Sequence, residues 1–181
     1  IGTAVAVTNL HPPGSSQSSA YAASGVYTGG FATLPHPTYG ALSHPRLWSA
    51  VDGTVTDLTP ANSVGGAVSA MDGEVQAGWY WWPYNTPHGV GYNKHACAWS
   101  GSAGTHVDIQ LSGWEFGSVS DTHNGQYVGT LRFDESSTNS HAFLWNSPVK
   151  AALKLTPAGM WGSGGAAVYD GCQFGSVHIG Y

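Results

Sequence analysis

Fixed charge is scarce in this sequence. Of its 181 residues, 5 are Lys or Arg and 10 are Asp or Glu, which together make 8% of the chain, whereas typical soluble domains carry roughly 25%. The basic residues are scattered along the chain, so there is no basic stripe that could neutralise a phosphate backbone, and nucleic acid is not an expected partner. They are Arg46, Lys94, Arg132, Lys150 and Lys154.

Long apolar runs are also missing. No stretch approaches the roughly 20 apolar residues that a membrane-spanning helix needs, so we expect no membrane insertion. The chain begins at Ile1 rather than Met, and no charged segment followed by an apolar one is present near its start. We therefore expect that an upstream piece has been removed or was never part of this sequence. A secreted protein that is extracellular or lies on the cell surface fits this expectation.

Cysteine is rare, but the apolar content is sufficient for a folded core. Cys97 and Cys172 are the two cysteines, while 41% of the residues are hydrophobic and 12% are aromatic, which excludes a disordered chain. A chain of this length can bury a core as one unit, so we take residues 1–181 as a single domain. The sequence carries no motif for a metal or a cofactor, and we expect neither.

A repeat of about 48 residues runs through the chain. A His-x-x-x-Trp frame begins at His44, His95 and His141, at spacings of 51 and 46. A polar residue followed by an aliphatic one recurs at positions 9, 57, 108 and 154, and a turn followed by a glycine-bounded stretch spans 24–29, 72–78, 124–129 and 170–175. Because the three markers keep the same order in every unit, the repeat is a property of the fold.

Each unit shows the two-residue periodicity of β-strands. Between residues 54 and 99, four short apolar runs are separated by Gly, Pro, Asn and Asp, and no helical pattern competes. Asp-Gly and Asn-Gly pairs at 72–73, 124–125 and 170–171 predict tight hairpins in which both central residues have positive φ. The sequence therefore predicts an antiparallel four-stranded meander in each unit.

Repeats of this length, with four strands and a recurring Trp, are typical of β-propeller blades. We predict an all-β, propeller-like domain of four repeats, each a four-stranded antiparallel blade, with units at approximately 1–50, 51–101, 102–147 and 148–181. By this count the last blade lacks a strand, which leaves an exposed sheet edge. Self-association or a second chain is expected to complete it, although a further stretch of the same polypeptide or an open edge are alternatives.

One repeat unit carries a family signature. The string His-Ala-Phe-Leu-Trp at 141–145 follows a Gly-x-x-x-Gly at 125–129 and precedes Leu-Thr-Pro at 155–157. In these features the chain resembles the extracellular HAF-repeat proteins, and the similarity covers nearly the whole chain through its repeats. The second unit, with His-Ala-Cys, is close to the signature, whereas the first, with His-Pro-Arg, departs from it. The resemblance implies a secreted or surface β-propeller and implies no reaction.

The recurring His and Trp residues are interpreted as structural. Each His is expected to tie its blade by bonding a neighbouring backbone carbonyl, and each Trp is expected in the core between blades. A metal site would need the three His to converge, whereas equivalent positions on successive blades radiate apart. The six repeat positions are His44, Trp48, His95, Trp99, His141 and Trp145.

Residues that interrupt the repeat are better functional candidates, because a blade needs only its consensus to fold. In the densest aromatic segment, strand alternation sends half of the rings to each face, so some lie outside the blade core. Exposed Trp and Tyr rings beside Asn and His are typical of sugar-binding sites, although packing against a neighbouring blade or subunit is the alternative. The candidate ligand-binding residues are Trp79, Trp81, Trp82, Tyr84, Asn85 and His88. Replacing Trp81 or Trp82 by Ala is expected to abolish binding.

No catalytic motif is evident. Asp121 and His123 share a turn, and Asp134 and Glu135 lie in the next loop, so a loop acid/base pair is one interpretation and a polar hairpin turn is the other. We predict a secreted non-catalytic module that binds a glycan or similar ligand, or a subunit of an extracellular assembly such as a filament or surface layer. The alternatives are an extracellular hydrolase acting on carbohydrate and a fragment of a larger propeller enzyme.

The two cysteines are predicted to stay unbridged. Cys97 lies on the closing strand of the second unit and Cys172 on a strand of the fourth, so two blade-to-blade steps separate them. A disulfide requires Cα atoms within roughly 7 Å. We expect two buried free thiols.

Overall fold

The fold is all-β. The computed structural model describes residues 8–86, 89–134 and 139–179; His88 and Glu135 lie outside these ranges. Strands account for 61% of the described residues, which form several antiparallel sheets, none of them closed into a barrel. The helical content of the same residues is one 3₁₀ turn, η1 (Ala103–Thr105), and none of their helices is long and apolar enough to cross a membrane. The predicted absence of extended helix is confirmed for these residues.

Successive antiparallel meanders follow one another along the chain. The first sheet contains β1 (Gln17–Ser24), β2 (Tyr27–His36), β3 (Gly40–Ser49) and β4 (Val55–Asp57). The second contains β5 (Gly66–Asp72), β6 (Val75–Thr86), β7 (Gly89–Trp99) and β8 (Val107–Asp108). The third contains β9 (Phe116–His123), β10 (Gln126–Arg132), β11 (Ser140–Trp145) and β12 (Leu153–Lys154), and the fourth contains β13 (Gly162–Tyr169) and β14 (Cys172–His178). A single parallel bridge between Lys94 and Phe116 joins the second and third sheets.

Each short outer strand closes the sheet before it. β4 pairs with β3, β8 with β7 and β12 with β11. The predicted units assigned these strands to the start of the following blade, and their pairing corrects that assignment. The loop from β3 to β4 is short and returns the chain to the free edge of β3, whereas the longer loop at 58–65 crosses to the next sheet. The fourth sheet therefore has two strands among the described residues instead of the three expected.

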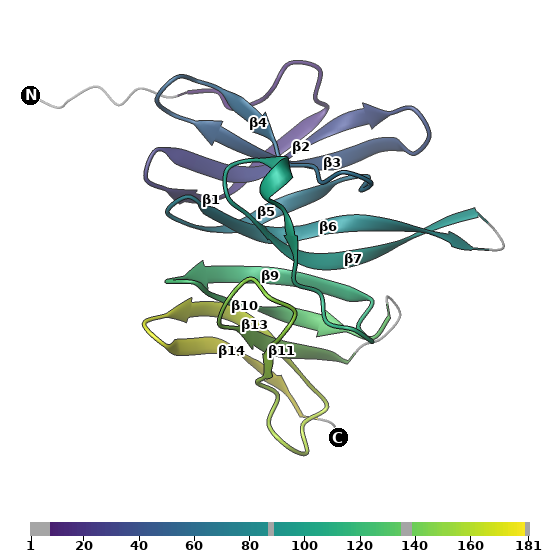
Figure 1. Ribbon diagram of the computed structural model, residues 1–181, viewed down its shortest axis with the longest axis vertical. Coiled ribbons are helices and arrows are strands. Elements are labelled where there is room, and N and C mark those ends of the chain that lie inside the picture. The colour runs from purple at the N-terminus through teal and green to yellow at the C-terminus, as the bar shows by residue number, and fades with distance from the viewer. Residues whose placement is uncertain (1–7, 87–88, 135–138, 180–181) are drawn as a thin grey trace, which may run out of the picture.

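The sheets pack face to face in a row, with the first and fourth at opposite ends (Figure 1). The first strand of each later sheet packs across the first three strands of the sheet before it. Trp99 packs with Leu47 and Leu58 between the first and second sheets. Trp145 packs with Val119 between the second and third. Apolar layers between sheets therefore form the core.

A bulge and a glycine recur at the same place in all four sheets. The first strand of each sheet has an extra residue, and these residues are Tyr21, Ser69, Ser120 and Ala166. On the adjacent strand, a Cβ would overlap a carbonyl oxygen of the first strand at Gly30, Gly78, Gly129 and Gly175. Both series repeat at spacings of 48, 51 and 46. The bulge brings two backbones together, and this close approach requires glycine.

Two of the three predicted hairpin turns have the expected geometry. Both central residues have positive φ at 124–125 (49° and 74°) and at 170–171 (45° and 77°). In the second sheet, however, β5 extends through Asp72, so the turn centres on Gly73 and Glu74. Of these two, only Gly73 has positive φ, at 56°. The prediction for 72–73 was therefore displaced by one residue.

The repeated His residues tie strands through hydroxyl groups. His44 Nδ1 lies 3.0 Å from the hydroxyl of Thr59, and His141 Nδ1 lies 3.0 Å from the hydroxyl of Thr156, in each case 15 residues later. The expected backbone carbonyl partner was therefore wrong for these two residues. The three repeated Trp side chains, Trp48, Trp99 and Trp145, are all buried.

Neither cysteine forms a disulfide, which confirms that prediction. Cys97 is buried, as expected, but Cys172 is exposed. The expected burial of Cys172 was wrong because nothing among the described residues covers the outer face of β14.

Candidate functional site

The β6–β7 hairpin is longer than its counterpart in the next sheet. β6 and β7 have 12 and 11 residues, whereas β10 and β11 have 7 and 6, so the hairpin projects beyond the sheet (Figure 1). Its base is fixed to the preceding loop, because Trp81 N–H donates to the Gly65 carbonyl (2.9 Å) and Val64 N–H donates to the Trp81 carbonyl (3.3 Å). The hairpin thus forms one wall of a cleft.

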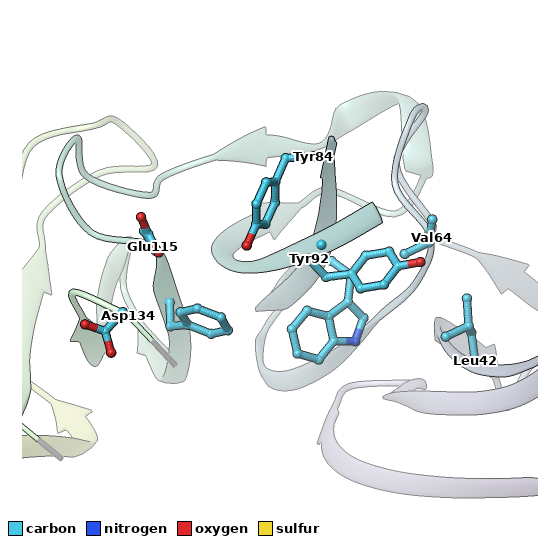
Figure 2. A pocket seen from close by; sticks show the side chains of 9 residues that line it. Leu42, Val64, Tyr84, Tyr92, Glu115 and Asp134 are labelled. Atoms are coloured by element: carbon cyan, nitrogen blue, oxygen red, sulfur yellow. The ribbon is translucent and has the colours of Figure 1, made fainter. Parts of the chain in front are cut away.

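This cleft has a volume of about 650 Å³. Its lining comes from three sheets and consists of Leu42, Val64, Trp81, Tyr84, Gly91, Tyr92, Glu115, Phe116 and Asp134. Figure 2 shows the rings of Tyr84 and Tyr92 between the carboxylates of Glu115 and Asp134 on one side and the aliphatic side chains of Leu42 and Val64 on the other. The cleft therefore has an aromatic centre, an acidic end and an apolar end.

Neighbouring groups hold the aromatic rings in place. Tyr84 lies over its cross-strand partner Gly91, where a Cβ would collide with the Tyr84 ring. Tyr92 makes an edge-on contact with Tyr39 from the β2–β3 turn, with ring centroids 5.4 Å apart. The rings are thus positioned before any ligand arrives, which lowers the entropic cost of binding.

A cation lies behind the aromatic wall. The ring of Trp79 meets that of Trp81 edge-on at 5.2 Å, and Lys94 Nζ lies 4.6 Å from the Trp79 ring centroid. Burial, with a smaller contribution from Arg132, lowers the pKa of Lys94 to about 8. The attraction between ammonium and ring partly offsets the cost of burying the charge.

The structure brings some of the predicted ligand-binding residues to this cleft. Trp81 and Tyr84 line it, and Trp79 lies behind Trp81. Asn85 is exposed further along the hairpin and is not among the lining residues, while His88 lies outside the described residues.

Trp82 does not line the cleft. Strand alternation places it on the opposite face of β6, where its ring stacks near His95 at 6.4 Å and meets Tyr80 edge-on at 6.3 Å. With 41% exposure, it is open to solvent on that face. The prediction grouped Trp81 with Trp82, although adjacent residues of a strand point in opposite directions.

Seven lining residues were not among the predicted ligand-binding residues, although Asp134 was named as a possible loop acid. Tyr92 could have been found from the hairpin register, because it pairs with Pro83 next to the aromatic run. Glu115, Phe116 and Asp134 come from the third sheet, and no local signal links them to β6. The remaining three are Leu42, Val64 and Gly91.

The turn with Asp121 and His123, which could have supplied an acid and a base, anchors the fourth sheet instead. Asp121 Oδ2 accepts a hydrogen bond from Val168 N–H (2.9 Å), and Asp121 Oδ1 accepts one from Thr122 N–H (2.9 Å). The His123 ring stacks on Tyr169 at 4.6 Å, and its Nε2 lies 3.5 Å from Asp170 Oδ1. These contacts support the structural interpretation of this turn.

A second titratable cluster surrounds His95, the repeat His of the second sheet. Its Nδ1 lies 3.3 Å from the Tyr80 hydroxyl and 3.4 Å from Asp108 Oδ2, which also accepts a hydrogen bond from Lys150 Nζ (3.0 Å). Burial alone would raise the pKa of Asp108, but the hydrogen bonds from His95, Gln110 N–H and Lys150 outweigh it and lower the pKa to about 2. This cluster links the second sheet to the loop before β12.

Within the part of the chain that the structure describes, no group of three or more His, Cys, Asp or Glu side chains could hold a metal ion. Comparison of the chain with protein-family models, with curated proteins and with solved structures found no match.

Proposed function

We propose that this chain is a non-catalytic, β-propeller-type module that binds a saccharide in the cleft beside the β6–β7 hairpin. The observation that carries this proposal is the set of held aromatic rings, Trp81, Tyr84 and Tyr92, next to two exposed carboxylates. Apolar C–H faces of a sugar ring pack on aromatic faces, while its hydroxyls bond to polar groups nearby. The cleft offers both in one space.

The charges around the cleft narrow the ligand class. Glu115 and Asp134 accept hydrogen bonds from hydroxyl or ammonium groups but repel carboxylates and sulfates. The whole chain carries a formal charge of −5, which adds to that repulsion. Neutral and amino sugars are the proposed ligands, and acidic saccharides are expected to bind more weakly.

The propeller assignment rests on the repeated unit. The bulge and its facing glycine occur in all four sheets, and both series have the same spacings of 48, 51 and 46 residues. Face-to-face packing of four-stranded meanders is the architecture of propeller blades. With the resemblance to HAF-repeat proteins, this supports an extracellular or surface module of blade-like repeats.

A glycan array and thermal-shift measurements with neutral, amino and acidic oligosaccharides test the proposal. We expect neutral or amino saccharides to raise the melting temperature, and Trp81→Ala and Tyr84→Ala to weaken binding at least about tenfold, a cost of roughly 1.4 kcal/mol. Trp82→Ala is the matched control, because this Trp is exposed on the other face of the same strand. Equal loss in Trp82→Ala, or binding of acidic saccharides alone, would contradict the assignment.

A carbohydrate hydrolase is the second candidate, favoured by the two carboxylates at one end of the cleft (Figure 2). Paired carboxylates flanking a glycosidic bond are the usual hydrolytic machinery. Incubation with the saccharides that bind, followed by analysis for shortened products, separates the two functions. Turnover that disappears in both Glu115→Gln and Asp134→Asn would establish the hydrolase and refute the binding module.

A further inference from the structure

The outer face of the fourth sheet repeats positions that contact the next sheet elsewhere in the chain. Gly29, Ala77, Val128 and Phe174 are equivalent, at spacings of 48, 51 and 46. A Cβ on Gly29 would meet Val68 of the second sheet. Ala77 and Val128 are fully buried in the layers shared with the third and fourth sheets. Phe174, by contrast, is 60% exposed.

The hairpin turns supply a second series of equivalent positions. Ser24 Oγ accepts a hydrogen bond from Gly73 N–H (2.9 Å), and Asp72 Oδ2 accepts one from Asn124 N–H (2.6 Å). At the next pair of turns the contact is between side chains, with His123 Nε2 3.5 Å from Asp170 Oδ1. Each turn thus contacts the next turn along the row. The fourth turn carries Tyr169 at the equivalent position, and this side chain is 62% exposed.

At the opposite end of the row, the first sheet carries the residues equivalent to those with which the later sheets face the sheet before them. Val68, Val119 and Gly165 are the residues with which the second, third and fourth sheets face the sheet before them. Their equivalent in the first sheet is Ala20, which is exposed. The first turn likewise begins with an exposed Gly25, equivalent to Gly73.

Residue sizes at these interfaces are complementary. Gly29 faces the larger Val68, and Val128 faces the smaller Gly165. At the free ends, the large Phe174 would face the small Ala20. A single chain cannot bring them together, because the first and fourth sheets lie at opposite ends of the row (Figure 1).

We infer that the outer face of β13 and β14 binds the first sheet of a second copy of this chain, head to tail. The contact continues the interface that the chain already makes three times internally. β1 of the second copy packs on β13 and β14, with its Ala20 against Phe174 and its first turn against Tyr169. Two such contacts between two copies form a ring of eight sheets, within the size range of propellers.

Light scattering coupled to size-exclusion chromatography tests the inference on the whole chain. Between about 1 and 100 μM, the range of modest protein interfaces, we expect a particle of twice the 18.8 kDa chain mass. Larger multiples would also support the contact, with a ring that stays open. A monomer throughout this range would overturn the inference, and saccharide binding in the cleft would then stand or fall separately.

Paired variants test the head-to-tail geometry. Phe174→Asp and Ala20→Asp each remove one side of the contact and should weaken assembly at least about 30-fold, as expected for a central interface residue. Each alone should be monomeric, whereas an equimolar mixture should form a dimer through the one intact pair of faces. Val177→Asp is the control, because Val177 is exposed on the other face of β14 and should leave assembly unchanged. A mixture that stays monomeric would overturn the geometry.

A measurement without substitution gives an independent test. Cys172 is exposed on the same face as Phe174, whereas Cys97 is buried. Alkylation of Cys172 should therefore slow as the chain concentration rises and assembly covers this face. A rate that does not depend on concentration over the range in which the particle mass doubles would place the contact elsewhere.

Discussion

Replacing Asp108 by Asn should destabilise the fold at neutral pH. The Asp108 carboxylate accepts hydrogen bonds from Gln110 N–H at 2.9 Å and from Lys150 Nζ at 3.0 Å, and it lies 3.4 Å from His95. Its side chain is 23% exposed, so solvent screens these contacts only in part. Asn keeps the shape and one acceptor but removes the charge.

The pKa of Asp108 gives the magnitude. Lowering it from 3.8 to about 2 corresponds to about 2.4 kcal/mol, since each pKa unit is worth 1.36 kcal/mol. Because the folded-state pKa is depressed, this stabilisation is complete above the unfolded value of 3.8 and is lost as the pH falls through about 2. We therefore expect Asp108→Asn to cost about 2 kcal/mol at pH 7 and progressively less towards pH 2.

Urea unfolding at pH 7, 4 and 3, followed by circular dichroism, measures this difference. The control is Asp170→Asn, whose carboxylate is 70% exposed and lies 3.5 Å from His123 Nε2. Because exposed ion pairs contribute little, this change should cost less than about 1 kcal/mol. A cost for Asp108→Asn that stays constant from pH 7 to pH 3 would refute the electrostatic explanation.

Other changes should also have measurable effects. Burial lowers the pKa of Lys94 from 10.5 to about 8, so the stability of the wild-type chain should rise between pH 8 and 10.5. Lys94→Met should be about 1–3 kcal/mol more stable than the wild type at neutral pH, and a less stable variant in urea titrations would disprove this. Gly78→Ala should cost more than about 2 kcal/mol of stability, because its Cβ would overlap a carbonyl oxygen of β5. Gly104→Ala is the control, since the added Cβ would have nothing closer than 3.9 Å, and should change the stability by less than about 1 kcal/mol in thermal melts. Equal costs would mean that the two backbones at Gly78 move apart to accept the Cβ. Burial raises the pKa of Cys97 well above its usual value, so one thiol, that of exposed Cys172, should react quickly in the native chain and two in urea; two fast native thiols would show that Cys97 is accessible.

The repeat was visible in the sequence because its markers have direct structural causes. Glycines such as Gly78 recur where two backbones approach at a bulge, and Trp99 and its equivalents recur in the layers between sheets. The sequence did not show, however, to which sheet β4 belongs. A strand of three residues, Val55–Asp57, carries too little pattern to show which neighbour it pairs with.

The cleft was predictable only where its residues are close in sequence. The aromatic run identified Trp81 and Tyr84. Alternation along β6 separates Trp82 from Trp81, but it would also have separated Tyr84 from Trp81, so alternation alone could not select the lining residues. Glu115 and Phe116 join them because the third sheet packs on the second, which is a long-range contact. The match between Phe174 and Ala20 emerged only when the sheets could be aligned through their bulges.

The arrangement in a row also determines how the chain should lose structure. The main contacts of each sheet are with its neighbours, so opening an end sheet breaks one interface and opening a middle sheet breaks two. The two-stranded fourth sheet should therefore show the fastest amide hydrogen exchange, and β6 and β9 the slowest. Trp81 and Phe116 belong to these two slow strands, so the walls of the cleft should keep their shape while the ends of the row open and close.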